Sequence, residues 1–375
     1  MARVAAQLTN FTAGELSPRL DGRNDLAKYS AGCKKVENLV IYPHGAAARR
    51  PGTTHVYEVK DSTKKTRLIP FEFSTTQTYI IEVGNLYMRF YRDNGIILSS
   101  GSPYEISTPY TEAQIFDLKF AQSADIMYIT HPSHQTRKLT RTGHTAWTLN
   151  TFDFTNGPFL DSNTSSTTFT PSATSGSVTI TASANTFAST DVDRQLRIGS
   201  GYAKITAYTS ATQVTATTTT NFANTTANTD WSLGAFSETT GYPSCVSFFE
   251  QRLVFAATLN NPQTVYLSKS GDYENMDANI GGTVADDDAI VYTIASNQVN
   301  AIRFLASTRT LIIGTAGGEF AVSGGGDNDA VTPTNIMIKK QSNHGAANVD
   351  AIPVGNATLF LQRAKRKIRE LAYNF

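Results

Sequence analysis

The stretch Ala301–Gly324, AIRFLASTRTLIIGTAGGEFAVSG, decides the predicted fold, because four other parts of the chain look like imperfect copies of it. Its apolar residues come in short runs, rich in β-branched and aromatic side chains. One run leads to a polar corner at Ser307, a second follows at 311–313, and a third returns after the turn at Gly317-Gly318. Runs of this length that are bounded by Gly favour β-strands over a helix.

The four copies are spaced along the chain in a way that indicates a repeat architecture. They begin at Leu68, Leu118, Val246 and Ile352. In three of the five copies a serine follows a phenylalanine by three positions, as Phe71/Ser74, Phe120/Ser123 and Phe304/Ser307. The copies start about 50 residues apart, except for one gap of well over a hundred, and such a period of short strands is typical of propeller blades. We therefore predict a mainly β protein, a β-propeller with a module inserted between its second and third copies.

Composition limits the function of the chain. Of 375 residues, 20 are Phe, 16 are Tyr and only 17% are charged, and the net charge is +1. A dedicated nucleic-acid binder usually has a strongly basic face and a pI above ~9, so tight DNA binding is not expected. Cys33 and Cys245 are too far apart in sequence to indicate a disulfide framework or a thiol metal site. No signal peptide and no membrane span are predicted.

Residues 1–52 are predicted to form an N-terminal docking region, irregular or helical. A helix is expected from Asp25, capped by Asn24, because Leu26, Tyr29, Cys33 and Val36 fall on one helical face. Gly32 lies inside that helix and costs about 1 kcal/mol relative to Ala. The helix would therefore need tertiary packing to persist.

The remaining chain is predicted to contain three parts. Residues 53–157 are the first part of the propeller, 158–235 an inserted Thr-rich β module, and 236–375 the second part of the propeller. Alternating apolar residues such as those of Ala203–Tyr208 favour strands in the module, and a flexible or glycosylated stalk is the alternative. Hosting the module costs little if its two ends lie close together. The last copy ends on a return strand, so we expect either that N-terminal strands complete the ring or that the chain is a shortened version of a longer one.

Signals for catalysis or metal binding are weak, and no catalytic residue, metal or cofactor is predicted. The chain has no P-loop, no HExxH motif, no nucleophile elbow and no repeated Ser-x-Asp-x-Gly box of a propeller sialidase. His131 and His134 could bind a metal, but a loop pair without an acidic or Cys partner favours polar surface. Asp286–Asp288, and Asp327 with Asp329, could hold a cation, but they lack the EF-hand spacing, which favours solvated turns.

Basic residues cluster in two regions. One cluster could face DNA, because its charges could contact phosphate: Arg363, Lys365, Arg366, Lys367 and Arg369. Each phosphate contact would add roughly −0.9 to the salt dependence of DNA binding. The other cluster is N-terminal, with Lys34, Lys35, Arg49 and Arg50. Pairing with acids across a subunit boundary, or plain solvation, is the interpretation that we favour for both, and a DNA-facing role is the alternative.

Two stretches resemble a known family. The opening Asn10–Arg23, NFTAGELSPRLDGR, followed by DLAKY at 25–29, Glu37-Asn38 and RRPG at 49–52, resembles the start of tail proteins of short-tailed bacteriophages and prophages. A later series is similar to the middle of the same proteins: DWSLGAF at 230–236, QRL at 251–253, PQTV at 262–265, SGDY at 270–273 and ASNQVNAI at 295–302. Together they cover nearly half of the chain in the expected order.

The resemblance is to the tail nozzle family, also called tail tubular protein B. It implies a structural virion protein without catalytic residues, assembled in the host cytoplasm as a homo-oligomer of six copies. The copies would form the distal tube of the tail, through which double-stranded DNA passes transiently. Its neighbours would be the tail adaptor ring and the tail fibres or needle. Members of this family typically continue well past the length of this chain, which leaves the tip region open.

We place the subunit interface of such an assembly in the N-terminal region. The interface candidates are Glu15, Arg19, Arg23, Lys34, Lys35, Arg49 and Arg50. The main alternative function is a receptor- or glycan-binding tail protein, in which the Thr-rich module would dock a ligand through exposed aromatic residues. The candidates for that role are Tyr202, Tyr208 and Trp231. A propeller hydrolase is a third and weaker hypothesis.

Overall fold

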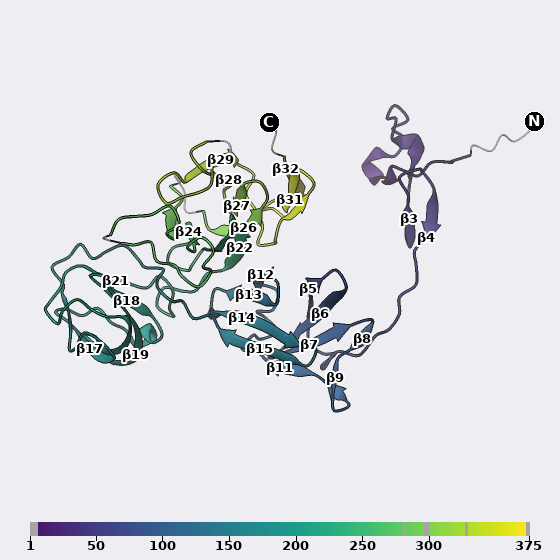
Figure 1. Ribbon diagram of the computed structural model, residues 1–375. Helices are drawn as coiled ribbons and strands as arrows, with labels where there is room; N and C mark the ends of the chain where they lie inside the picture. The colour runs from purple at the N-terminus through teal and green to yellow at the C-terminus, as the bar shows by residue number, and fades with distance from the viewer. Residues whose placement is uncertain (1–6, 281, 296–299, 327–328, 373–375) are drawn as a thin grey trace, which may run out of the picture. The chain divides into compact units, whose positions relative to one another are not determined.

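The chain divides into two compact units, Met1–Tyr57 and Glu58–Phe375. Figure 1 shows the computed structural model, which describes residues 7–280, 282–295, 300–326 and 329–372. Within these ranges the chain is mainly β, and the second unit is a β-propeller of five blade sheets, as predicted. No described helix is long and apolar enough to cross a membrane. Residues 296–299 of the later resemblance and Asp327 lie outside the described residues.

The N-terminal unit consists of short strands and turns. Its elements are β1 (Gly14–Glu15), η1 (Pro18–Leu20), η2 (Tyr29–Ala31), β2 (Gly32–Cys33), β3 (Leu39–Ile41) and β4 (Ala47–Arg49), where η marks a 3-10 turn. Strand β1 pairs in parallel with β2, and β3 pairs antiparallel with β4. The unit is therefore two small two-stranded sheets joined by irregular chain.

The predicted helix from Asp25 is wrong, because tertiary pairing overrides a weak local preference. Gly32 has an extended backbone, with φ −115° and ψ 162°, and pairs with Gly14 across the parallel strands. A Cβ at Gly32 would lie 2.5 Å from Cγ of Leu16, so the close approach of these strands requires glycine. Since Gly32 already weakens the helix, the strand pair prevails.

The first two blades occupy residues 67–151. The first blade contains β5 (Arg67–Ser74), β6 (Gln77–Gly84), β7 (Tyr87–Arg92), β8 (Gly95–Ile96) and β11 (Glu105–Ser107), with a small hairpin of β9 (Leu98–Ser99) and β10 (Ser102–Pro103) beside it. The second contains β12 (Lys119–Ser123), β13 (Ile126–His131), β14 (His134–Gly143) and β15 (Ala146–Thr151). Each of these blades is an antiparallel sheet in which the first strand of the copy lies at one edge.

The last three blades follow the inserted module. The third contains β22 (Cys245–Phe249), β23 (Arg252–Ala256), β24 (Thr264–Leu267) and β25 (Ile290–Thr293); the fourth contains β26 (Ile302–Ser307), β27 (Leu311–Thr315), β28 (Gly318–Ser323) and β29 (Met337–Ser342). The fifth has three strands, β30 (Ile352–Val354), β31 (Ala357–Leu361) and β32 (Ile368–Ala372). All five predicted copies thus begin a blade. Ser74, Ser123 and Ser307, which follow a Phe by three positions, each end the first strand of a blade.

The inserted module is one six-stranded sheet with its own core. Its strands are β16 (Phe169–Pro171), β17 (Ser177–Ala182), β18 (Gln195–Ile198), β19 (Gly201–Ser210), β20 (Gln213–Thr220) and β21 (Trp231–Leu233), with the 3-10 turn η3 (Ser189–Asp191). The chain enters and leaves side by side, because the Ala235 amide donates to the Pro158 carbonyl at 2.8 Å. The module therefore adds a folded sheet to the propeller without separating the flanking blades in space.

Apolar clusters join successive blades in chain order. Phe71 and Ile129 share the cluster between the first and second blades, and Tyr128 and Phe255 share the one between the second and third. The third and fourth blades share a cluster that contains Val265 and Ile313. Phe304 and Phe360 share the cluster between the fourth and fifth. Burial of apolar area between adjacent blades is therefore what holds the propeller together.

The first and fifth blades each have an uncovered face. Among the described residues no apolar cluster contains side chains from both of these blades. Leu68 of β5 and Ile352 of β30 are each 64% exposed; alternate residues of β5 face a core, whereas all three residues of β30 are exposed. The propeller thus leaves one apolar blade face free at each end of the series.

Candidate functional site

The seven predicted interface residues all lie in the N-terminal unit and all are exposed. Some of them are held by local contacts. The Glu15 carboxylate accepts the Val36 amide at 2.8 Å, Arg23 forms an ion pair with Asp25 at 2.6 Å, and Arg50 donates to the Asn38 side chain at 3.1 Å. Lys35 pairs with Glu37 at 2.9 Å, and both partners remain exposed. The structure therefore leaves all seven charged side chains exposed, although Arg23 and Lys35 are paired with neighbouring carboxylates.

The N-terminal unit has no apolar core of its own among residues 7–57. No hydrophobic side chain in this range is buried. Leu39 and Val40 of β3 are 46% and 42% exposed, and Tyr42, directly after the strand, is 44% exposed. A domain of this size is marginally stable even with a good core, so a unit without one depends on an external surface. The predicted helical face of Leu26, Tyr29, Cys33 and Val36 did not indicate that Leu39, Val40 and Tyr42 would be exposed.

The basic cluster predicted near the C-terminus lies in the turn between β31 and β32 and at the start of β32. We call Arg363, Lys365, Arg366, Lys367 and Arg369 the basic turn. Arg369 is half-buried and the other four are exposed. None of the five forms an ion pair with any described residue. The cluster is thus a concentration of uncompensated positive charge.

A second charged group, which the sequence did not indicate, lies where the first strands of several blades begin. We call Arg67, Asp117, Lys119, Cys245 and Asp350 the axial cluster. Lys119 Nζ is 2.7 Å from Asp350 Oδ1, and Asn348 donates to Asp117 at 3.2 Å. Arg67 donates to the carbonyls of Ile115 and Leu118 at 3.1 and 2.8 Å. The cluster therefore ties the segment before the fifth blade to the start of the second.

Burial changes the pKa values of two members of the axial cluster. It lowers the pKa of Arg67, with Asp350 and Asp117 acting in the opposite direction. Burial also raises the pKa of the Cys245 thiol to about 11, against the opposing charge of Lys119. A thiol with a raised pKa is a poor nucleophile. Cys245 is therefore suited to packing and not to reaction.

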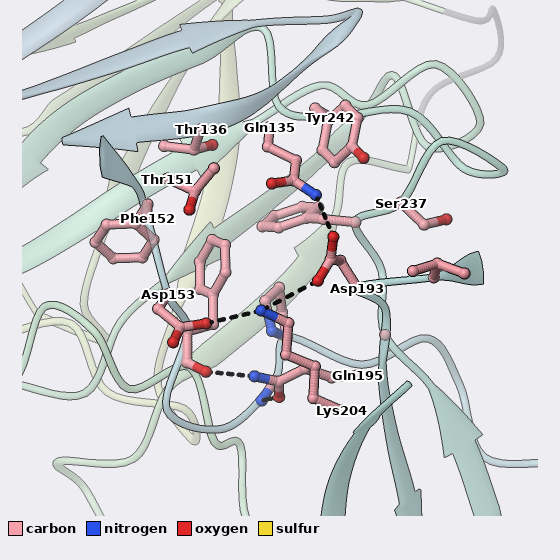
Figure 2. Close-up of a pocket in the computed structure, with 16 residues that line it drawn as sticks. Gln135, Thr136, Thr151, Phe152, Asp153, Asp193, Gln195, Lys204, Ser237 and Tyr242 are labelled. Atoms are coloured by element: carbon pink, nitrogen blue, oxygen red, sulfur yellow. Dashed lines mark hydrogen bonds and ion pairs between the residues drawn. The ribbon is translucent and has the colours of Figure 1, made fainter. Parts of the chain in front are cut away.

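A small cavity lies between the module and the second blade (Figure 2). Lys204 of the module stands between two carboxylates in this view, at 3.1 Å from Asp153 and 3.4 Å from Asp193. Burial alone would lower the pKa of Lys204, but its hydrogen bonds and charge interactions with the two carboxylates raise it above its usual value. Gln195 accepts the Gly157 amide at 2.7 Å and donates to the Phe154 carbonyl. These contacts fix the module against the linker that precedes it.

The size of this cavity decides what it can hold. Its volume is about 50 Å³, enough for a few water molecules at 10–15 Å³ each. Sites for small molecules usually measure roughly 300–1,000 Å³. The cavity is therefore a narrow gap between two packed parts and is too small for a sugar or a cofactor.

The three aromatic residues proposed for ligand docking are mostly unavailable. Tyr202 is buried, and its hydroxyl donates to the Asp277 carboxylate at 3.0 Å. Trp231 stacks on Phe169 with ring centroids 4.0 Å apart and is half-buried. Tyr208 alone of the three is exposed, at 37%. A carbohydrate platform needs several exposed rings, so these side chains give little support to glycan binding.

The candidate metal ligands are mostly engaged in internal contacts. His131 is buried, its Nδ1 faces the Ser133 amide at 3.1 Å, and burial lowers its pKa to about 4. His134 lies against the Gln114 side chain at 3.1 Å. Within the described ranges no group of three His, Cys, Asp or Glu side chains is placed to hold a metal.

The acidic run at 286–288 was expected to be a solvated turn, and it is one only in part. Asp286 and Asp287 are exposed, whereas Asp288 is buried and pairs with Lys269 at 2.7 Å. The buried Arg252 donates to the carbonyls of Asp286 and Asp288 at 2.7 and 2.6 Å. The backbone carbonyls of this run therefore bind the side chain of Arg252. Asp329, of the second acidic pair, is exposed.

Comparisons with known proteins add little on function. A scan against models of known families finds no match, and a search of curated proteins finds none either. Among solved structures, the chain is similar to YCF48 bound to D1 peptide, at 11% identity over 82% of this chain and 95% of that one, with a TM-score of 0.24. It is also similar to the WD40 repeats of RRP9, at 10% identity over 80% of this chain and 91% of that one, with a TM-score of 0.25. The phage phi92 endosialidase is similar at 10% identity over 81% of this chain and 48% of that one, with a TM-score of 0.24. TM-scores this low carry no argument about what the chain does.

Proposed function

We propose that this chain is a structural subunit of a short phage tail and that copies of it assemble into the distal tube through which DNA passes. The proposal rests on the resemblance of Asn10–Arg23 and the stretches that follow it to the tail nozzle family. It also rests on an incomplete N-terminal unit, which needs another surface to be stable. Under this proposal the chain is not an enzyme, and its partners are further copies, an adaptor ring and fibres or a needle.

The single observation that carries the proposal is the absence of a core in the described part of the N-terminal unit. Leu39, Val40 and Tyr42 are all more than 40% exposed, and the exposed Arg49 lies at the end of the paired strand β4. Exposed apolar side chains bordered by charges are typical of an interface with a polar rim. Subunits of a ring need heterologous interfaces, in which two different surfaces of neighbouring copies meet. The ring closes when the rotation between copies allows it.

The charge of the chain is compatible with a passage for DNA. With a net charge of +1, the chain has no general attraction for phosphate. A tube that releases DNA should not retain it, because each phosphate contact adds to the affinity. Positive charge is concentrated locally, in the basic turn and in the N-terminal cluster of Lys34, Lys35, Arg49 and Arg50.

Substitution of the exposed apolar residues tests the proposal. We expect Leu39→Asp with Val40→Asp to reduce the oligomer fraction of the full chain, as measured by mass photometry, because two charges would be desolvated in the interface. Leu259→Asp is the matched control, since Leu259 is 77% exposed and lies outside the N-terminal unit. Unchanged assembly in the double variant, or equal loss in the control, would count against an N-terminal interface.

Receptor or glycan binding is the second candidate. It would use the exposed face of the Thr-rich module, but Tyr208 is the only one of its three candidate rings that is exposed. We therefore place it behind the tail-tube proposal.

A further inference from the structure

Strands β3 and β4 of the N-terminal unit form a ribbon that is exposed on both faces. Among the described residues the two strands pair only with each other. Leu39 lies directly opposite Arg49, and Val40 lies opposite Ala48. Because opposite residues share a face and successive residues alternate between faces, Leu39 and Arg49 stand side by side on one face and Val40 points to the other. The first of these faces therefore combines an exposed apolar side chain with an exposed cation.

The charge around this face limits the kind of surface that could cover it. Residues 7–57 carry seven Arg or Lys against four Asp or Glu, an excess of three positive charges. Arg49 forms no ion pair with any described residue. Complementary charge gives an interface its specificity, whereas like charges that face each other cost several kcal/mol. The face thus fits a surface that is both apolar and acidic.

The connection between β24 and β25 of the third blade has this composition. Residues 269–288 contain six Asp or Glu against one Lys. Asp288 pairs with Lys269, and Glu274 pairs with Lys138. Three acids of the connection are exposed and form no ion pair within the described ranges: Asp272, Asp286 and Asp287. Val284 lies two positions before Asp286 and is 44% exposed. We call residues 283–288 the acidic loop.

The acidic loop is held in place by bonds that leave its outer carboxylates unused. The buried Arg252 binds two of its carbonyls, as described above. The Ser270 amide donates to the Asp287 carbonyl at 3.0 Å, and the Ala285 amide donates to the Asp288 carboxylate at 2.8 Å. The positive charge of Arg252 offsets one of the exposed carboxylates at most. A surface that is already ordered loses little conformational entropy when a partner binds.

We propose that the face of the β3–β4 ribbon that carries Leu39 docks on the acidic loop of a second copy of this chain. Leu39 would pack on Val284, and Arg49 would face the carboxylates of Asp286 and Asp287. The ribbon and the loop are different surfaces, so each copy can offer its ribbon to one neighbour and its loop to another, as a ring requires. Nucleic acid would match Arg49 but would leave Leu39 uncovered. This inference rests on the tail-tube proposal, because it requires that copies assemble, and it names the surface that receives the N-terminal unit.

Crosslinking between copies tests the contact. The full chain with Cys33→Ser serves as the background, since Cys245 is buried. We expect a chain with Leu39→Cys, mixed with a chain with Val284→Cys, to form a covalent heterodimer with a short bismaleimide linker. Leu39→Cys mixed with Leu259→Cys is the matched control and should form none, because Leu259 is exposed outside the acidic loop.

Charge exchange tests the electrostatic part of the contact. Arg49→Glu should raise the dissociation constant between copies about tenfold or more, as measured by mass photometry, because attraction becomes repulsion. Asp286→Lys with Asp287→Lys should have the same effect. The chain that carries all three substitutions should recover the affinity, which also shows that the variants fold. Arg366→Glu and Glu72→Lys reverse exposed charges elsewhere and should assemble as the unchanged chain does.

The outcomes separate this inference from the tail-tube proposal. Oligomers that form normally in both reversal variants, or that are lost in both and not recovered in the triple variant, would overturn the docking on the acidic loop alone. Equal crosslinking to Leu259→Cys would do the same. A linker that joins both cysteines within one diluted chain carrying Leu39→Cys and Val284→Cys would assign the contact to a single copy. An unchanged chain that stays monomeric would contradict both proposals.

Discussion

Lys119 and Asp350 form an ion pair of 2.7 Å although 231 residues separate them in sequence. Lys119 begins the first strand of the second blade and is 5% exposed, whereas Asp350 stands just before the fifth blade and is more open to solvent. A buried ammonium group needs a counter-charge, because removal from water disfavours its charged form. The pair therefore links distant blades at the beginning of their first strands.

Asp350→Asn should destabilise the propeller. The substitution leaves the Lys119 charge buried without its carboxylate, and we expect a loss of about 1–3 kcal/mol in the free energy of unfolding. The loss should fall short of that for a fully buried pair, because the Asp350 side chain is 48% exposed. Urea unfolding followed by fluorescence measures it. Asp25→Asn, which breaks the exposed pair with Arg23, is the control and should leave the free energy of unfolding unchanged. Equal losses in the two variants would show that the pair of Lys119 and Asp350 does not stabilise the fold.

Cys245 should be protected from thiol reagents in the folded protein. Its thiol is buried, and burial raises its pKa to about 11, whereas Cys33 is half-buried. We expect a colorimetric thiol assay near neutral pH to detect one fast cysteine in the native chain and two after unfolding in urea. In Cys33→Ser the fast phase should disappear. If a fast phase persists in that variant, Cys245 reacts in the native chain, which would contradict its burial at the start of β22.

Stability should fall as the pH decreases from about 6.5 to about 4, in part because of His131. Burial, with a contribution from His134, lowers the pKa of His131 to about 4 in the folded state, against a reference value of 6.5. The unfolded chain therefore binds a proton in this window that the folded chain does not, and acidification favours unfolding. His131→Gln should flatten the profile of the urea midpoint against pH in this range. His55→Gln, at an exposed position, serves as the control, and equal profiles for the two variants would contradict the assignment.

Trp231 should contribute to the stability of the module. It stacks on Phe169, and its indole donates to the Thr167 carbonyl at 2.9 Å. We expect Trp231→Ala to cost about 2–3 kcal/mol in unfolding free energy, less than a fully buried tryptophan. Tyr208→Ala should cost little, because Tyr208 is exposed. A larger loss of unfolding free energy in Tyr208→Ala than in Trp231→Ala would contradict this prediction. Loss of glycan-array binding in Tyr208→Ala, with stability unchanged, would favour the receptor-binding alternative.

The fold was predictable where the determining signal is local and repeated. The apolar runs beginning at Leu68, Leu118, Val246, Ala301 and Ile352 each correspond to a blade, because strands of three to eight residues carry their own local apolar pattern. Asp93 and Asn94, which precede Gly95, both adopt positive φ, as the hairpin turns typical of such a sequence require.

The remaining features depend on contacts that leave no local pattern. The helix expected from Asp25 is absent because Gly32 pairs with Gly14 across two parallel strands. This contact joins residues that are distant in sequence, so no local pattern indicates it. The axial cluster could not be foreseen, since Lys119 and Asp350 have no shared motif or spacing.

Electron microscopy of the full chain in negative stain, alone and with the adaptor ring, tests the central claim most directly. The account predicts six-fold rings or tubes with a central hole, and predicts that a chain lacking residues 1–57 keeps a folded propeller but forms none. Persistent monomers of the full chain in both samples, or intact rings from the shortened chain, would contradict it.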